Sequence, residues 1–369
     1  MGDLMYPDPL DEYPIHQVPL SMARTETSDR NFYDRYYFNA HDQTGRVYFV
    51  SGFGVYPNLG VVDAFATVTR GTDQRAVRFS DALDTRYRDQ VGGYRIEVIE
   101  PLETLRLVGE HPDLSFDLTW RGSFRAVLED RHLLMGGLRP NLDASRFAQL
   151  GSWEGTLSVD GEDFAVDPAV WMGSRDRSWG IRPSGEPDPL ERTAELRPDG
   201  FWWVYCPLRF DDFAIVLIAQ EDGDGFRSLN YAVRVDRDGA VEQLGWPRFE
   251  ISYKPGTREM ASVRIHLTDR RGEQTVIDLE PKTFLTLQIG AGYGSDPEWS
   301  HGRWMGRDWS LSSRYDTAAP EFAQRKTNGV VEYVVHARCG DAVGSGMFEH
   351  RVAGRHSPSG FDSPTAMAR

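Results

Sequence analysis

The sequence predicts a mainly β, antiparallel protein made of two related halves. Aromatic residues form 12% of the 369-residue chain and Gly occurs 36 times. Short runs of β-branched and aromatic residues alternate with Gly, Asp and Pro, which is typical of antiparallel strands joined by tight turns. A Trp-Met-Gly motif followed by Arg-Asp occurs at residues 171–176 and again at 304–308. Each copy lies late in its half, which favours two lobes built on one plan.

Strand candidates follow one another along both halves, and helical periodicity is almost absent. In the first half they are Tyr33–Ala40, Val47–Phe53, Val61–Val68, Tyr94–Pro101, Leu105–Glu110, Leu114–Arg121, Gly151–Val159 and Phe164–Trp171. In the second half they are Phe201–Arg209, Phe213–Gln220, Ser228–Val235, Arg248–Tyr253, Met260–Leu267, Thr275–Gln288, Val330–Arg338 and Gly344–Val352. Asp160-Gly161 is the dipeptide that type I′ hairpin turns favour. Short helices or lids are expected at Asn141–Gln149 and Pro320–Gln324.

A polar, proline-rich stretch at residues 181–198 separates the halves, because it cannot supply a central strand. We therefore expect a first β domain at residues 29–190 and a second at 191–354. Residues 1–28 are proline-rich and acidic, and residues 355–369 are small and polar. Neither terminal segment can bury much apolar surface, which predicts a loose N-terminal segment and a disordered C-terminal tail.

Charge and composition exclude several kinds of partner. The formal net charge of −15 disfavours nucleic acid, because it repels a phosphate backbone. No apolar run approaches the roughly 18–20 residues that a membrane-spanning helix needs. The first residues carry acids and prolines where a signal peptide would carry basic residues before an apolar stretch. We therefore expect a cytoplasmic protein without integral membrane association; the sequence does not define its oligomeric state.

Common cofactor and metal chemistries find no support in the sequence. Cys206 and Cys339 each lie in an apolar strand candidate, where cysteines are usually small core residues. The nine histidines show no spacing that would assemble a zinc site. Gly52-Phe53-Gly54 lacks the third glycine and the following helix of a dinucleotide fingerprint. We expect neither a metal nor a cofactor.

The first copy of the repeated motif supplies candidate catalytic residues. Arg175 and Asp176 place two charges on a strand that otherwise faces an apolar interior, so the charges must be paired or useful. One interpretation is structural: the pair closes a barrel mouth and Trp179 fills its floor. The other is functional, with Asp176 as an acid. For the second copy, Arg307-Asp308, the structural interpretation is favoured.

Aromatic residues and one histidine extend this set. In the strand that begins at Phe201, Trp202 and Val204 face one way while Trp203 and Tyr205 face the other. Rings on an internal face suit an apolar ligand, although they suit a core as well. His301 stands in a Gly-rich, aromatic segment just before the second motif, where it could carry a proton near neutral pH or simply bond to backbone.

The order of these motifs resembles a known superfamily. Arg175-Asp176-Arg177-Ser178-Trp179-Gly180, then a Gly-aromatic-Trp strand, then Asp211-Asp212 is similar to the two-domain lipocalin-like superfamily of carotenoid 1,2-hydratases (hydroxyneurosporene synthases) and AttH-like proteins. The chain resembles even more the uncharacterised tandem-domain members that carry Arg-Asp-x-Ser-Trp-Gly in one half and His-Gly-x-Trp in the other, here at His301–Trp304. The resemblance implies two lipocalin-like antiparallel β-barrel domains side by side.

The hydratase resemblance also implies a reaction. An acid protonates an isolated carbon–carbon double bond, aromatic rings shield the cation, and water traps it. Burial raises the pKa of an Asp whereas an adjacent Arg lowers it, so Asp176 can act as the acid only if its side chain points away from Arg175. Neighbours on a strand do point apart. The chain departs from the expected pattern, because Tyr205 and Asp211 stand at a longer spacing than the Tyr-x-Asp of that chemistry.

The sequence therefore predicts a cofactor-independent hydratase, isomerase or cyclase acting on a hydrophobic small molecule such as an isoprenoid, a steroid or a lipid. Its cavity lies in the first lobe or between the lobes. The catalytic candidates are Asp176 as acid, Arg175 as its orienting charge and His301 as a second proton carrier. The expected substrate-binding residues are Trp179, Trp202, Tyr205 and Trp304. The alternative is a non-catalytic carrier of a hydrophobic metabolite, which needs the same cavity without an acid; the second lobe could also be only a brace.

Overall fold

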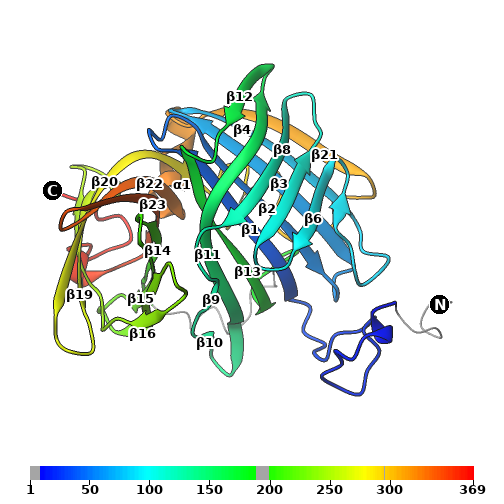
Figure 1. The fold of residues 1–369 in the computed structure, drawn as a ribbon, viewed down its shortest axis with the longest axis horizontal. Helices are drawn as coiled ribbons and strands as arrows, with labels where there is room; N and C mark the ends of the chain where they lie inside the picture. The colour runs from blue at the N-terminus through cyan, green and yellow to red at the C-terminus, as the bar shows by residue number, and fades with distance from the viewer. Residues whose placement is uncertain (1–8, 188–198, 295) are drawn as a thin grey trace.

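The two predicted lobes are present as two curled antiparallel sheets that lie side by side (Figure 1). The computed structural model describes residues 9–187, 199–294 and 296–369. Nearly all regular structure in these ranges is β, which confirms the all-β, lipocalin-like prediction. The domain boundary expected between residues 190 and 191 lies outside the described residues.

The first sheet has 14 strands, in the order β21-β4-β3-β2-β1-β13-β11-β8-β7-β6-β5, with β9, β10 and β12 also paired to β11. Its strands are β1 (Phe32–Asp42), β2 (Tyr48–Tyr56), β3 (Val61–Arg70), β4 (Asp73–Ala82), β5 (Gln90–Val91), β6 (Tyr94–Glu100), β7 (Thr104–Gly109), β8 (Leu114–Gly122), β9 (Val127–Leu128), β10 (His132–Gly136), β11 (Arg139–Val159), β12 (Glu162–Val166), β13 (Trp171–Ile181) and β21 (Trp309–Asp316). The curl of this sheet encloses the first core.

The second sheet has nine strands, in the order β17-β16-β15-β14-β23-β22-β20-β19-β18. They are β14 (Phe201–Arg209), β15 (Phe213–Asp222), β16 (Arg227–Asp236), β17 (Val241–Gln243), β18 (Arg248–Tyr253), β19 (Met260–Thr268), β20 (Gln274–Thr286), β22 (Val331–Cys339) and β23 (Ala342–Ala353). The helical elements are short: the 3-10 turns at Pro9–Glu12, Pro320–Phe322 and Ser357–Ser359, and α1 (Ala323–Asn328). The helix expected near Pro320 is thus confirmed.

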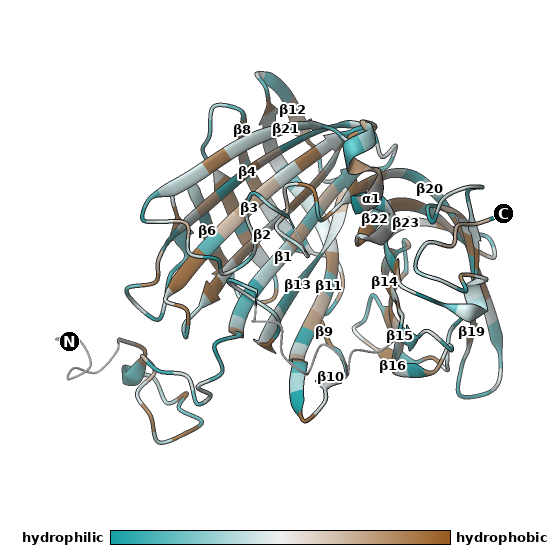
Figure 2. Ribbon diagram, turned by 180° about the vertical axis from the view of Figure 1, so that it is seen from behind, coloured by the Kyte–Doolittle hydropathy of each residue, from teal (hydrophilic) through white to brown (hydrophobic). Residues whose placement is uncertain are grey.

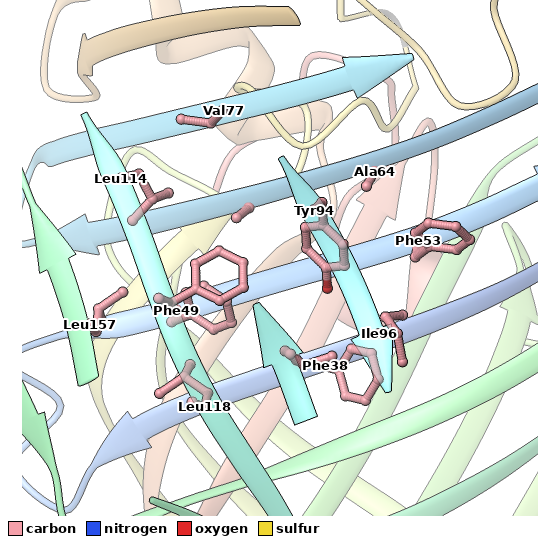
Figure 3. Close-up of a cluster of buried hydrophobic side chains, with 14 of the residues drawn as sticks. Phe38, Phe49, Phe53, Ala64, Val77, Tyr94, Ile96, Leu114, Leu118 and Leu157 are labelled. Atoms are coloured by element: carbon pink, nitrogen blue, oxygen red, sulfur yellow. The ribbon is translucent and has the colours of Figure 1, made fainter. Parts of the chain in front are cut away.

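Strand alternation divides the molecule into three apolar layers. Phe38 lies in the core inside the first sheet, where Figure 3 shows it with Phe49, Phe53 and Tyr94. Its neighbour Tyr37 points the other way, into a layer shared by both sheets. A third layer covers the far face of the second sheet. Hydrophobic and hydrophilic stretches accordingly alternate along the strands (Figure 2). Because side chains fill the interior of the first sheet, space for a ligand is left between the lobes.

The structure confirms the predicted Asp160-Gly161 turn and corrects the secondary structure predicted for Asn141–Gln149. Asp160 and Gly161 have φ values of 52° and 81°, the positive pair that a type I′ turn requires, and they join β11 to β12. The expected helix at Asn141–Gln149 is wrong: these residues belong to β11 and pair with β13. Ala144 and Ala148 are both buried and lie on the same face of that strand.

The two copies of the Trp-Met-Gly motif do not occupy equivalent positions. The first lies within β13, in the middle of the first sheet, whereas the second leads into β21, which crosses over and pairs with β4 at the edge of the same sheet. Arg307 there is exposed and forms an ion pair with Asp84 at 2.8 Å. The second Arg-Asp pair is therefore structural.

The C-terminal segment differs from the expected disorder, because it packs on the second sheet. Phe361 is 1% exposed. Arg258 donates hydrogen bonds to backbone carbonyls of Val352 and Gly354 and, in the tail, to those of Ser363, Pro364 and Ala366. The buried guanidinium of Arg258, two residues before β19, thus holds a tail that has little apolar surface of its own.

Candidate active site between the two sheets

A cavity of about 470 Å³ lies between the two sheets. Its walls come from β1, β10, β11 and β13 of the first sheet and from β14, β15, β16 and β23 of the second, together with residues 182–187 and the segment after β20. Because strand side chains alternate, each wall contributes every second residue, such as Phe201, Trp203 and Tyr205. The volume falls in the range of ~300–1,000 Å³ that small-molecule sites usually occupy.

Three of the residues proposed from the sequence meet in this cavity: Asp176, His301 and Tyr205. Asp176 and Arg175 do point apart, as neighbours on β13 must. Arg175 turns to the other face of the sheet, where its Nε donates to Gln149 Oε1 at 2.8 Å and its guanidinium lies over Trp120 and Phe147. It therefore cannot orient the carboxyl of Asp176 by direct contact.

The other three candidates lie outside the cavity. Trp202 faces the far core of the second sheet and stacks on His356, because it alternates with the cavity-facing residues of β14. Trp179 is 37% exposed, near the end of β13, and Trp304 is 51% exposed in the segment before β21. The tryptophan that does line the cavity is Trp203, which stacks on His132 with 5.5 Å between ring centroids.

Asp176 is a buried carboxyl with electrostatic neighbours but no hydrogen bond from any described residue. It lies on β13 opposite Tyr37 of β1 and Ala148 of β11, and it is 8% exposed. Burial raises its pKa, while nearby guanidinium groups, chiefly those of Arg146 and Arg35, oppose the shift. An acid with these properties holds a proton more readily than an exposed Asp and can present it to a ligand.

A second carboxyl and an arginine form a buried pair at another part of the wall. Arg146 donates a short hydrogen bond to Glu129, and its guanidinium lies 4.4 Å from the ring centroid of Tyr205. Burial raises the pKa of Glu129 to about 7, although Arg146 opposes the shift. The Tyr205 hydroxyl and Glu129 Oε1 are buried without a hydrogen-bond partner in the described ranges. Both residues belong to the cavity wall.

Two glutamates share the layer between the sheets. Glu332 of β22 and Glu349 of β23 are directly opposite each other in the sheet register. Tyr37 and Tyr48 donate their hydroxyls to Glu332 at 2.7 and 2.9 Å, and Trp203 donates its indole N–H to Glu349. Burial, and for Glu332 the neighbouring Glu349, raises the pKa of both carboxyls. The pair therefore keeps a proton to a higher pH than an exposed glutamate does, since two buried adjacent carboxylates repel each other.

His301 lines the cavity as a neutral side chain. Its Nε2 lies 2.8 Å from the carbonyl oxygen of Ala291, and its Nδ1 lies 3.0 Å from a guanidinium nitrogen of Arg35. A guanidinium can only donate, so Nδ1 accepts and Nε2 carries the hydrogen. Burial and the charges of Arg35 and Arg182 lower the pKa of His301 well below its usual value. This environment opposes the role of proton carrier that the sequence suggested.

Sequence reasoning missed Arg35, Arg146, Glu129, Glu332 and Glu349. A usable signal existed for the two glutamates, because each interrupts an otherwise apolar strand candidate. For Arg35 the signal was Gly52 and Gly54: a Cβ at either position would lie within about 3.0 Å of the Arg35 side chain. These glycines make room for the arginine side chain.

Two further features bear on the type of site. In the described ranges, no group of three or more His, Cys, Asp or Glu side chains is arranged to hold a metal ion. No helix formed by these residues has the length and apolar character needed to cross a bilayer. The cysteines predicted to be core residues are both free thiols, and Cys206 is fully buried.

Fold and site together define a two-domain lipocalin-like protein with a cavity of small-molecule size between its lobes. The chain belongs to a family of unknown function, DUF8625, whose sequence profile matches residues 8–362. A comparison with curated protein sequences gives no match.

Solved structures confirm the fold predicted from the superfamily resemblance. An AttH-like protein of Nitrosomonas europaea has a TM-score of 0.53 and 14% identity, with 92% of this chain and 98% of that chain covered. CghA, in a crystal structure with Sch210972, has a TM-score of 0.50 and 12% identity over 87% of this chain and 88% of its own. Kievitone hydratase from Nectria haematococca is also similar, at a TM-score of 0.48 and 15% identity over 86% of this chain and 88% of that one. At these identities the likeness concerns the fold alone.

Proposed function

We propose that the chain is a cofactor-independent enzyme of the hydratase, isomerase or cyclase type that protonates a hydrophobic small molecule in the cavity between the sheets. The observation that carries this proposal is the carboxyl of Asp176, which is buried, free of hydrogen bonds from the described residues, and faces a cavity with aromatic walls. An enzyme that protonates carbon needs a carboxylic acid whose proton is not already committed to a neighbour.

The chemistry uses Asp176 as the acid. It transfers its proton to one carbon of a double bond, and the positive charge that develops on the other carbon is shielded by aromatic rings of the cavity wall, such as Trp203. In a hydration, water adds to that carbon and returns its proton to Asp176; in an isomerisation or cyclisation, a neighbouring carbon of the substrate loses the proton instead. The carboxyl is regenerated in each case, so no further reactant is consumed.

His301 acts in this proposal as a neutral positioning residue. Because its Nδ1 accepts from Arg35, it holds that guanidinium at the cavity wall. Glu349 is a second protonatable group within the same wall, and its partner Glu332 is anchored to the first sheet by two tyrosines. Asp176 and the Glu332–Glu349 pair thus provide two places where a proton can be stored close to one ligand.

Two kinds of support come from outside the site itself. CghA, which has the same fold, has been crystallised with a small molecule. The two free cysteines fit a reducing compartment such as the cytoplasm, which we propose as the location. Isoprenoids, steroids and comparable lipophilic compounds are the substrates that the aromatic lining favours.

The test is native mass spectrometry of protein purified from its own host, followed by incubation of the co-purified molecule with wild type and with Asp176→Asn. The expected result is a bound small molecule whose mass or retention changes with wild type and not with the variant. Asp308→Asn is the matched control, because Asp308 is exposed and occupies the same motif position in the second copy. Equal conversion by wild type and Asp176→Asn would remove the acid assignment, and a retained but unconverted molecule would favour a carrier.

A further inference from the structure

One end of the cavity carries a buried positive charge without an ion-pair partner. Arg35 is 3% exposed and lines the cavity, and its Nε has no hydrogen-bond partner. A guanidinium taken out of water is costly unless anions or carbonyl groups receive its hydrogens. Among the described residues, no carboxylate oxygen lies within 4.0 Å of it.

The contacts that Arg35 makes do not include an anion, and its Nε hydrogen has no acceptor. His301 Nδ1 accepts from one terminal nitrogen at 3.0 Å. The other terminal nitrogen lies 3.2 Å from His301 Nε2, but that atom already donates its hydrogen to Ala291, so a donor faces a donor there. The guanidinium also lies 5.6 Å from the ring centroid of Tyr293, and the Tyr293 hydroxyl is close enough to contribute a hydrogen-bonding interaction that favours the charged arginine.

A second arginine reinforces the charge at this end. The Arg182 guanidinium lies 5.4 Å from the ring centroids of both Tyr33 and Tyr293. Its side chain makes no hydrogen bond or ion pair within the described ranges. Arg35 and Arg182 therefore both lie against Tyr293 at the cavity wall. Arg146, by contrast, is already paired with Glu129.

The nearby carboxyls do not neutralise the two arginines. Asp63 interacts with Arg35 at a distance, but its Oδ2 receives the backbone N–H of Gly302 at 2.6 Å and burial raises its pKa to about 7, so it is only partly ionised at neutral pH. Asp176 is the other acid close to both guanidiniums. Gly52 and Gly54 leave the space that the Arg35 side chain fills, so its position is built into β2.

We propose that the ligand of this cavity is an apolar molecule with one anionic oxygen group, such as a carboxylate or an acidic enol, which binds between Arg35 and Arg182. This inference rests on the proposed use of the cavity as a small-molecule site and adds the ligand's charge and orientation. The anionic group occupies the Arg35 end, its apolar body extends along Trp203 and Tyr205, and the carbon atoms next to the anion face Asp176.

The experiment compares two fluorescent probes that share one aromatic skeleton and differ in charge: anilinonaphthalene sulfonate, an anion, and N-phenylnaphthylamine, which is neutral. Their dissociation constants are measured by fluorescence titration with wild type, Arg35→Met, Arg182→Met and the control Arg307→Met, which removes an exposed arginine away from the cavity. The ratio of the two constants cancels losses of apolar binding that affect both probes.

Wild type is expected to bind the anionic probe at least about tenfold more tightly than the neutral one, as a charge-assisted contact predicts. Arg35→Met should abolish this preference, Arg182→Met should reduce it, and Arg307→Met should leave it unchanged. If Arg35→Met no longer binds the neutral probe, the fold of that variant is damaged. The ratio of the two dissociation constants for Arg182→Met then tests the proposal. No anionic preference in wild type, or a preference that survives in both cavity variants, overturns the proposal.

The probe ratio and the catalytic test fail independently. If wild type binds its co-purified molecule without converting it while the anionic preference remains, the protein is an anion-binding carrier; if Asp176→Asn converts that molecule as wild type does, only the acid assignment is lost. A lost anionic preference together with an Asp176-dependent reaction would leave an acid–base enzyme with a neutral substrate.

Discussion

Replacing Asp63 by Asn should make the stability of the protein less dependent on pH. Asp63 lies on β3, is 1% exposed, and receives the Gly302 N–H at 2.6 Å. Burial raises its pKa from 3.8 to about 7, and the charge of Arg35 opposes the shift. An Asn at this position keeps an oxygen for Gly302 and removes the titration.

The direction in which stability changes with pH follows from the raised pKa of Asp63. The folded state binds the Asp63 proton more tightly than the unfolded chain, so the protonated carboxyl stabilises the fold below about pH 4, and this stabilisation is lost as the pH rises through about 7. A shift of about three units corresponds to about 4 kcal/mol in all. Between about pH 5 and about pH 8 the loss attributable to this group is about 2–3 kcal/mol.

Urea unfolding at several pH values between these limits measures the effect. The free energy of unfolding of wild type, minus that of Asp63→Asn, should fall by about 2–3 kcal/mol from about pH 5 to about pH 8. Asp84→Asn is the control, because the Arg307 hydrogen bond lowers the pKa of Asp84 and its titration ends below this range. A constant difference between wild type and Asp63→Asn would show that Asp63 ionises normally and would refute the reasoning.

Three further substitutions test how the scaffold is held. Arg258→Ala removes the donor to five backbone carbonyls, and should lower stability by about 2–4 kcal/mol and expose residues 355–369 to limited proteolysis. Gly180→Ala should lower the thermal midpoint strongly or prevent folding, because φ is 134° and its Cβ would lie 2.1 Å from the carbonyl oxygen of Asp143. Trp153→Phe leaves the Asn39 carbonyl without its 2.8 Å indole donor and should cost about 1–3 kcal/mol in denaturant unfolding; an unchanged midpoint contradicts this assignment.

The sequence predicted those features that depend on neighbours along the chain. Alternating apolar residues and tight-turn dipeptides are local signals, so the all-β class and the Asp160-Gly161 turn followed from them. The same alternation required Arg175 and Asp176 to point apart, as they do. The error at Asn141–Gln149 arose because Arg146 interrupts the apolar face of this strand where it lines the cavity, which weakens its apolar alternation.

Other features depended on contacts between distant segments. A period of two tells which residues share a face of a strand, but both faces of β14 are buried, so the sequence could not decide whether Trp202 or Trp203 meets the cavity. Likewise β21 pairs with β4 across more than two hundred residues of chain, which separates the two copies of the repeated motif.

The candidate site shows most clearly which features follow from local sequence and which depend on contacts between distant segments. Two features of the site could be predicted from the sequence alone: an acid on a strand, at Asp176, and aromatic side chains on an internal face. Only the tertiary structure decided that Tyr37 and Tyr48 bind Glu332, almost three hundred residues away, and that Arg35 lies beside His301. The physical reason is that burial, charge pairing and proton affinity depend on which surfaces the two sheets press together, and local periodicity carries no information about that packing.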